Sequence, residues 1–186
     1  MEFQAGDIYL VDSDRVGARI VKFLMTAPTL WQYIWRALRH TQQKVRFYHA
    51  GMCVYDNKVI EQQGVVEYED VYDAILKKKK AIVYRYKHLT EAQKEGLLFT
   101  AYQDLGEKYD WLLIIGRTLT WLTGIKWFTR KIQLRDHEFC VTRVAYWFYE
   151  VLGVTFGQRT WHEVTTDSID DFCKTNTNDW EVVYES

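Results

Sequence analysis

The stretch FYHAGMCVYDNKVIE, residues 47–61, predicts a β-hairpin that carries a histidine at its head. Two apolar segments, YHAGMCVY and KVIEQQ, are joined around Asp56 and Asn57, residue types that are common in tight turns. Histidines in strands are mostly half-buried and hydrogen-bonded, without a chemical role. His49 therefore becomes a functional candidate only if the rest of the chain supplies a nucleophile. Alternation along the strand predicts core positions opposite His49 for Ala50, Met52 and Val54.

The composition predicts one compact domain over residues 1–186. A chain of this length can bury most of its unfolded surface without a metal or disulfide. Its 24 basic and 25 acidic residues give a formal charge of −1, which removes the general electrostatic argument for nucleic-acid binding. The three cysteines are widely spaced and form no CxxC motif, so neither a disulfide framework nor a zinc site is indicated. We therefore expect no metal and no cofactor.

Neither the N-terminus nor the apolar segment 112–132 has the pattern of a secretory signal or a membrane-spanning helix. The N-terminus MEFQAGDIYLVDSD lacks a basic region followed by an apolar one, so it is not a secretory signal. The apolar segment 112–132 is interrupted by Arg117 and Lys126, a poor fit to the uncharged run of about 20 residues that spans a membrane. We expect a cytoplasmic protein, unless a phage or a lysis system delivers it elsewhere.

Hydrophobic periodicity and capping residues predict the remaining elements. GDIYLVD, AIVYRY and WEVVYE are typical of strands. Thr90 and Gln93 form a capping box that starts a helix, and Gly106 marks its end. From Val141 onward, apolar residues recur at helical intervals until Gly153, which favours a second helix. Cys140 therefore lies in the first turn of that helix.

Two segments, at about 15–39 and 112–132, are predicted to be helical inserts rich in aromatic residues. They combine large apolar rings with arginine and lysine, a mixture suited to the boundary between water and lipid. An acyl chain or an amphipathic lipid could dock on them, which would give a peripheral membrane contact. The alternative is that their tryptophans fill the core between the inserts and the sheet. The residues concerned are Trp31, Tyr33, Ile34, Trp35, Leu38, Trp121, Ile125, Trp127 and Phe128, with Arg36, Arg39, Lys126, Arg130 and Lys131.

The position of Cys140 makes it the candidate nucleophile. A thiol reacts as its thiolate, and the free thiol pKa of about 8.5 is lowered at a helix N-terminus or beside an imidazolium. The alternative is structural, because free cysteine also packs as a small buried hydrophobe. Cys53, in the middle of a strand, and Cys173, near the C-terminus, are expected to be inert.

A strand histidine and a helix-start cysteine, far apart in sequence, match the two parts of a papain-like dyad. Together with GDIYLV, YHAGMCVYDNKVIEQQGVV, LGEKYDW, FCVTRVAYWFYEVLGV and TTDSIDDF, they resemble the NlpC/p60 superfamily of papain-like cysteine hydrolases. His49 precedes Cys140, as in the circularly permuted branch that includes lecithin:retinol acyltransferase-like proteins. The resemblance implies an α+β fold: a curved antiparallel sheet of about five to six strands, packed by the helix that carries the cysteine.

Carried onto this chain, the resemblance implies Cys140 as nucleophile, His49 as general base and Glu61 as the residue that orients the imidazole. Hairpin geometry leaves an alternative: a two-residue turn would place Gln62 on the His49 face, whereas a three-residue turn or a bulge would place Glu61 there. The backbone N–H of Cys140 would meet the oxyanion. The chain departs from the family pattern directly after the cysteine, where Val141, Thr142 and Arg143 stand.

Three functions remain open from the sequence. The first is a cysteine hydrolase or acyltransferase that forms a thioester acyl-enzyme on an acylated or amphipathic substrate. The second is a peptidase or amidase that acts on cell-wall peptides or on a protein. The third is a non-catalytic binding module on the same fold, which the residues after Cys140 keep open.

Overall fold

The computed structural model describes residues 2–12, 34, 45–62, 65–107, 119, 123 and 140–186. The chain divides into two compact units, one comprising Met1–Ser13, Phe47–Tyr109 and Phe139–Ser186, and the other Asp14–Arg46 and Asp110–Glu138. The predicted helical inserts fall almost entirely outside the described residues. Within these two segments the structure describes Ile34, Leu119 and Thr123, and all three are helical. The prediction of one domain with two inserts therefore stays a prediction. Among the described residues, no helix is long and apolar enough to span a bilayer.

The first unit is built on a six-stranded antiparallel sheet in the order β4-β3-β2-β1-β5-β6. Its strands are β1 (Ile8–Asp12), β2 (His49–Cys53), β3 (Lys58–Gln62), β4 (Val66–Asp70), β5 (Lys80–Tyr86) and β6 (Trp180–Glu185). The helices are η1 (Tyr72–Leu76), α3 (Glu91–Gln103), α6 (Cys140–Leu152), η2 (Trp161–Glu163) and α7 (Thr166–Thr175). The predicted α+β class, with a small antiparallel sheet and a helix beginning at Cys140, is confirmed at this level.

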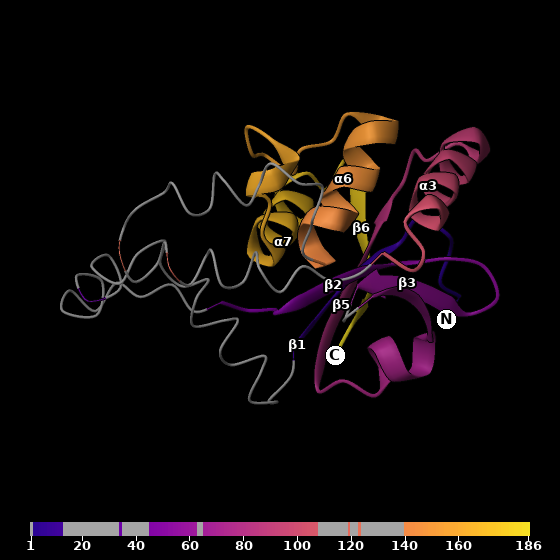
Figure 1. Ribbon diagram of the computed structural model, residues 1–186, viewed down its shortest axis with the longest axis horizontal. Helices are drawn as coiled ribbons and strands as arrows, with labels where there is room; N and C mark the ends of the chain where they lie inside the picture. Colours follow the sequence, from indigo (N-terminus) through magenta and orange to yellow (C-terminus); the bar gives the residue numbers. More distant parts are fainter. Residues whose placement is uncertain are drawn as a thin grey trace. The chain divides into compact units, whose positions relative to one another are not determined.

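Both faces of the central strands are buried. Even-numbered residues of β1 and β2 pack into the core cluster shared with α3, α6 and α7. Odd-numbered residues pack into a second cluster with η1 and the start of β5. Figure 1 shows α3, α6 and α7 on one side of the sheet and the short helix η1, in magenta, on the other. The predicted core residues Ala50, Met52 and Val54 are buried in the helix-side cluster, as expected.

The turn of the hairpin has three residues. The register pairs Gly51 with Glu61 and Cys53 with Val59, and the N–H of Val54 bonds the carbonyl of Lys58 at 2.9 Å. Tyr55, Asp56 and Asn57 form the loop, and the last two adopt positive φ angles of 61° and 55°. Asn and Asp tolerate this conformation better than other residues with side chains. This turn length places Glu61 on the same face as His49, and Gln62 on the opposite face.

Helix capping follows the sequence signals. The capping box of Thr90 and Gln93 begins α3, and a second capping box of Thr165 and Ser168 begins α7. The α6 helix starts at Cys140, and Gly153 follows its end with a φ of 68°. Glycine is favoured there because it has no Cβ to clash in the left-handed region. Cys140 is thereby fixed at the opening of a 13-residue helix.

Candidate active site

His49 is the first residue of β2 and is 5% exposed. Its Nε2 lies 2.7 Å from Oε2 of Glu61 on the neighbouring strand β3. A carboxylate only accepts hydrogen bonds, so Nε2 carries the proton in this pair. The other ring nitrogen, Nδ1, is then the one that can pair with the thiol of Cys140, to which the histidine side chain is also hydrogen-bonded.

Cys140 is half-buried at the first position of α6. Its thiol is hydrogen-bonded to the His49 side chain and accepts a hydrogen bond from the backbone N–H of Ala50. Desolvation raises the pKa of the thiol, but the charge of His49 and these hydrogen bonds outweigh it, so the pKa lies below its usual value. Desolvation lowers the pKa of His49, while the charges of Cys140 and Glu61 raise it to well above its usual value overall. The geometry therefore favours a thiolate–imidazolium pair.

Glu61 is a buried carboxylate with partners on three strands. It accepts hydrogen bonds from His49 on β2, from the hydroxyl of Tyr9 on β1 and from the carboxyl of Glu69 on β4. Burial raises its pKa, but the charge and hydrogen bond of His49, with the hydrogen bonds of Glu69 and Tyr9, together outweigh burial, so the net pKa lies far below the ordinary range. Glu61 thus holds a negative charge beside the imidazole at every pH near neutral.

Glu69 shares this site and holds its proton up to about pH 7. Burial, then its hydrogen bond to Glu61 and the negative charge there, raise its pKa from 4.5 to about 7. Two carboxyl groups can be hydrogen-bonded only when one of them holds a proton, and Glu69 is the one that keeps it. A proton donor on the far side of Glu61 restrains that carboxylate in the position that contacts His49.

Glu69→Gln is expected to make stability less dependent on pH. Because the folded-state pKa of Glu69 is about 7 against 4.5 for the model carboxyl, the wild type loses stability as pH rises through this window. Glutamine keeps a donor for Glu61 and cannot ionise. The variant should match the wild type at pH 5 and exceed it at pH 8 by about 1 kcal/mol, allowing for solvent screening.

Urea denaturation at both pH values measures this difference. Glu67→Gln, an exposed position on the same strand, is the matched control and should show no such change. A difference between wild type and Glu69→Gln that is equal at pH 5 and pH 8 would contradict the prediction.

Gly51 makes room for Tyr9. The register places Gly51 opposite both Tyr9 and Glu61, and a Cβ on Gly51 would lie 2.5 Å from Cε1 of the Tyr9 ring. The phenol therefore crosses directly over the glycine to reach the carboxylate. Neither Tyr9 nor Glu69 was predicted as a site residue from the sequence. A glycine inside an apolar strand is a usable signal, since it often marks a close approach by another group.

Gly51→Ala is expected to destabilise the protein by about 1–3 kcal/mol, because the added methyl overlaps the Tyr9 ring in a closed core. The midpoint of thermal unfolding measures the effect. Adding Tyr9→Ala removes the overlapping ring, so the double variant should lose less stability than the two single losses combined. An unchanged midpoint for Gly51→Ala would contradict the assignment.

The residues after the cysteine hold α6 in place. Val141, Thr142 and Arg143 are all buried. The guanidinium of Arg143 lies 3.1 Å from Oδ2 of Asp104 and 2.7 Å from Oε2 of Glu107, at the end of α3. Arg143, where the sequence departs from the pattern of the similar family, therefore forms ion pairs that join α6 to the segment directly after α3.

A second contact positions the start of β2. The hydroxyl of Thr166, in the first turn of α7, donates to the carbonyl of Phe47 at 2.7 Å and is fully buried. Phe47 stands two residues before His49. The segment TTDSIDDF, residues 165–172, thus fixes the backbone just before β2, the strand that carries His49.

The structure brings together Cys140, His49 and Glu61, the three residues proposed from the sequence. Gln62 does not contact the His49 ring, because it faces the helix side of the sheet. Cys53 and Cys173 are buried away from the dyad, and burial raises the pKa of both thiols. The charge of Arg85 lowers the pKa of Cys53, but burial and the negative charge of Asp7 outweigh it, so neither thiol is activated as that of Cys140 is.

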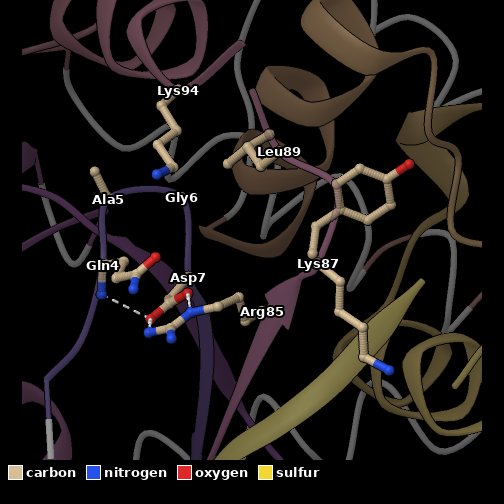
Figure 2. Close-up of a pocket in the computed structure, with 9 residues that line it drawn as sticks. Gln4, Ala5, Gly6, Asp7, Arg85, Lys87, Leu89 and Lys94 are labelled. Atoms are coloured by element: carbon tan, nitrogen blue, oxygen red, sulfur yellow. Dashed lines mark hydrogen bonds and ion pairs between the residues drawn. The ribbon is translucent and has the colours of Figure 1, made fainter. Parts of the chain in front are cut away.

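A separate hollow of about 150 Å³ lies at the opposite end of β1. Figure 2 shows Arg85 facing Asp7 there, with Nε–Oδ1 and Nη2–Oδ2 distances of 2.8 and 2.7 Å. This bidentate pair satisfies both groups. Its lining shares no residue with the Cys140 site.

No protein-family model and no curated protein matches the sequence. A solved structure is similar: "Crystal structure of metalloprotein yiiX from Escherichia coli O157:H7, DUF1105", with a TM-score of 0.55 and 19% identity over 100% of this chain and 90% of that one. In the described part of this chain, no group of three or more His, Cys, Asp and Glu residues could hold a metal ion. What the likeness shows is the fold: in the described residues, an antiparallel six-stranded sheet with its helices, similar to that of yiiX.

Proposed function

We propose that the chain is a papain-like cysteine hydrolase or acyltransferase of the circularly permuted NlpC/p60 branch. The observation that carries the proposal is the contact of a lowered-pKa thiol with an imidazole held by a buried carboxylate. The family motifs and the order His49 before Cys140 support the same assignment, and the fold similar to yiiX agrees with it.

The chemistry follows from the dyad. The Cys140 thiolate attacks the carbonyl carbon of an amide or ester, and the carbonyl electron pair moves to oxygen. Collapse of this intermediate expels the amine or alcohol, which takes the proton held by His49 and leaves a thioester on Cys140. His49, now neutral, removes a proton from water or another acceptor as its oxygen attacks the thioester. The thiolate is released and the dyad is restored.

Glu61 acts through His49 and does not itself touch the substrate. It fixes the tautomer with the proton on Nε2, so Nδ1 faces the sulfur, and its charge stabilises the imidazolium. Arg143 is paired with Asp104 and Glu107, which weakens the argument for a non-catalytic module based on the residues after Cys140.

For the substrate, we propose an acylated or amphipathic molecule that docks through the tryptophan-rich inserts. The support is their combination of aromatic and basic residues. Incubation with lipid vesicles and, separately, with cell-wall muropeptides distinguishes lipid from peptide substrates. Acyl release from the lipid, together with a shift of tryptophan fluorescence on vesicles, is expected. Cleavage of muropeptides alone would favour the peptidase or amidase alternative.

An acylating probe tests the dyad itself. A p-nitrophenyl ester should label Cys140 at pH 7 and release nitrophenolate, and peptide mass spectrometry should locate the acyl group. Cys53 and Cys173 serve as internal controls, since their buried thiols have raised pKa values. Absence of labelling at Cys140 across pH 6 to 9 would contradict an enzymatic function and favour the binding module.

A further inference from the structure

One carboxylate oxygen of Glu61 accepts two hydrogen bonds from different strands. Nε2 of His49 lies 2.7 Å from Oε2 of Glu61, and the hydroxyl of Tyr9 donates to the same oxygen. All three residues are buried. The oxygen atom that orients the imidazole is therefore itself held by a phenol.

The strand register builds this contact. Tyr9, Gly51 and Glu61 stand in one row across β1, β2 and β3. A Cβ on Gly51 would lie 2.5 Å from the phenol oxygen, so the hydroxyl reaches Glu61 only because the middle residue of the row has no side chain. The Tyr9 ring belongs to the apolar cluster on the η1 side of the sheet. Packing in that cluster fixes the ring, and with it the position of the hydroxyl.

The contact matters most when His49 is neutral. Burial raises the pKa of Glu61, and the largest opposing effect is the charge of His49. That charge is present in the thiolate–imidazolium pair, but it is absent when His49 acts as the base that removes a proton from water. Hydrogen bonds to Glu61, from His49, Glu69 and Tyr9, must then keep the buried carboxylate ionised.

Uptake of a proton by Glu61 would reverse its hydrogen bond to His49. The carboxylic acid would donate to Nε2, so the neutral imidazole would carry its own proton on Nδ1. Nδ1 is the ring nitrogen that faces Cys140, and it can act as a base only while it holds no proton. Removal of the acyl group from Cys140 therefore requires that Oε2 of Glu61 stays an acceptor.

Tyr9 and Glu69 donate over different pH ranges. Glu69 holds its proton only up to about pH 7, with Lys78 lowering its pKa and Asp73 of η1 raising it. The pKa of Tyr9 lies well above its usual value of 10, because of burial and then of the charge and hydrogen bond of Glu61. The phenol is thus a donor at every pH near neutral, whereas the carboxyl of Glu69 is not.

We propose that Tyr9 is a positioning residue for deacylation: its hydroxyl keeps Oε2 of Glu61 as the acceptor of the Nε2 proton while neutral His49 acts as the base. This inference rests on the proposed hydrolase or acyltransferase function. Water or another acceptor gives its proton to Nδ1 as its oxygen bonds the thioester carbon, and the carbonyl electron pair moves to oxygen. Return of that pair breaks the carbon–sulfur bond and releases the thiolate. The Nε2 proton stays on His49, and Tyr9 keeps its own.

The reaction with p-nitrophenyl acetate separates acylation from deacylation in the full-length protein. Nitrophenolate needs no proton to leave, so its burst reports the thiolate. Loss of acetyl from Cys140, followed by mass spectrometry, reports the base. At pH 8, Tyr9→Phe should lose acetyl about 10- to 100-fold more slowly than wild type, the usual effect of losing a hydrogen bond to a charged group. Its burst rate should stay within about threefold of wild type. At pH 6, where Glu69 is protonated, the difference in acetyl loss should be smaller.

Two further variants are the controls. Tyr84 is another buried tyrosine whose hydroxyl donates to a carboxylate, that of Asp170, but its ring belongs to the helix-side cluster. Tyr84→Phe removes the same kind of bond and should change neither rate. In His49→Ala, acetylated in alkaline solution, the base is absent, so adding Tyr9→Phe should change acetyl loss by less than about twofold.

The outcomes distinguish this role from the proposed function. Wild-type acetyl loss in Tyr9→Phe, an equal slowing of burst and acetyl loss, or the same ratio at pH 6 and pH 8 would overturn the role of Tyr9 and leave the dyad standing. A further loss in the His49→Ala background would also overturn it. So would a wild type that keeps its acetyl group both in water and with butanol as acceptor. A wild type that is alkylated by iodoacetamide but never acylated would remove the proposed function, and the inference with it.

Discussion

His49→Ala is expected to slow acylation of Cys140 at pH 7 by about 10²- to 10⁴-fold, the range typical for loss of a general acid–base residue. The charge and hydrogen bond of His49 lower the pKa of the Cys140 thiol, against the increase that desolvation causes. Without the ring, burial is left largely unopposed, so the thiol pKa should rise. At pH 6 the wild type should still be alkylated by iodoacetamide, whereas the variant should react only in alkaline solution.

Recovery at high pH distinguishes lost activation from misfolding. If the variant is folded, its alkylation rate should climb as pH passes the raised thiol pKa, and its unfolding curve should stay cooperative. His88→Ala, at an exposed histidine, is the matched control and should react like wild type. Equal reactivity of His49→Ala and wild type at pH 6 would show that no thiolate–imidazolium pair exists.

The variant Glu61→Gln separates the effect of the negative charge of Glu61 from the effect of its hydrogen bond to His49. Glu61→Gln keeps an oxygen that can accept from Nε2 of His49 but removes the negative charge. Its acylation rate should therefore fall between those of wild type and His49→Ala. A rate as low as that of His49→Ala would show that the charge of Glu61 is required for the imidazole to act at all.

Arg143→Met should lower the free energy of unfolding by about 3–5 kcal/mol, the usual effect of removing one member of a buried ion pair. The guanidinium is 4% exposed and binds two carboxylates, while Asp104 also accepts from the indole N–H of Trp147 at 2.7 Å. Removing Arg143 leaves Asp104 charged and largely buried. Denaturant unfolding measures the loss.

Glu107→Gln is the control for this pair. The Glu107 side chain is 48% exposed, so water can replace much of what it loses, and the variant should lose far less stability than Arg143→Met. If Arg143→Met kept wild-type stability but lost acylation, Arg143 would be a substrate contact and not a link between α3 and α6.

The candidate residues could be selected from sequence because each depends on a local pattern. Cys140 stands where helical periodicity begins, and His49 stands at the start of an apolar strand. The choice of Glu61 over Gln62 comes from the family resemblance, because hairpin geometry alone leaves the choice open: it depends on one residue of turn length. Adding a residue to a turn reverses every side chain of the following strand. The aromatic inserts and their proposed lipid contact lie outside the described residues and stay predictions.

Local order along the chain determined the elements: the hairpin, the capped helices, the cysteine at a helix start and the histidine at a strand head. Tertiary structure alone decided which groups meet. It placed Tyr9 and Glu69 around the carboxylate of Glu61 and bonded the Ala50 N–H to the thiol. The physical reason is that propensities and caps act over a few neighbouring residues, whereas these contacts join strands and a helix distant in sequence. Their geometry is fixed only when register and packing form together.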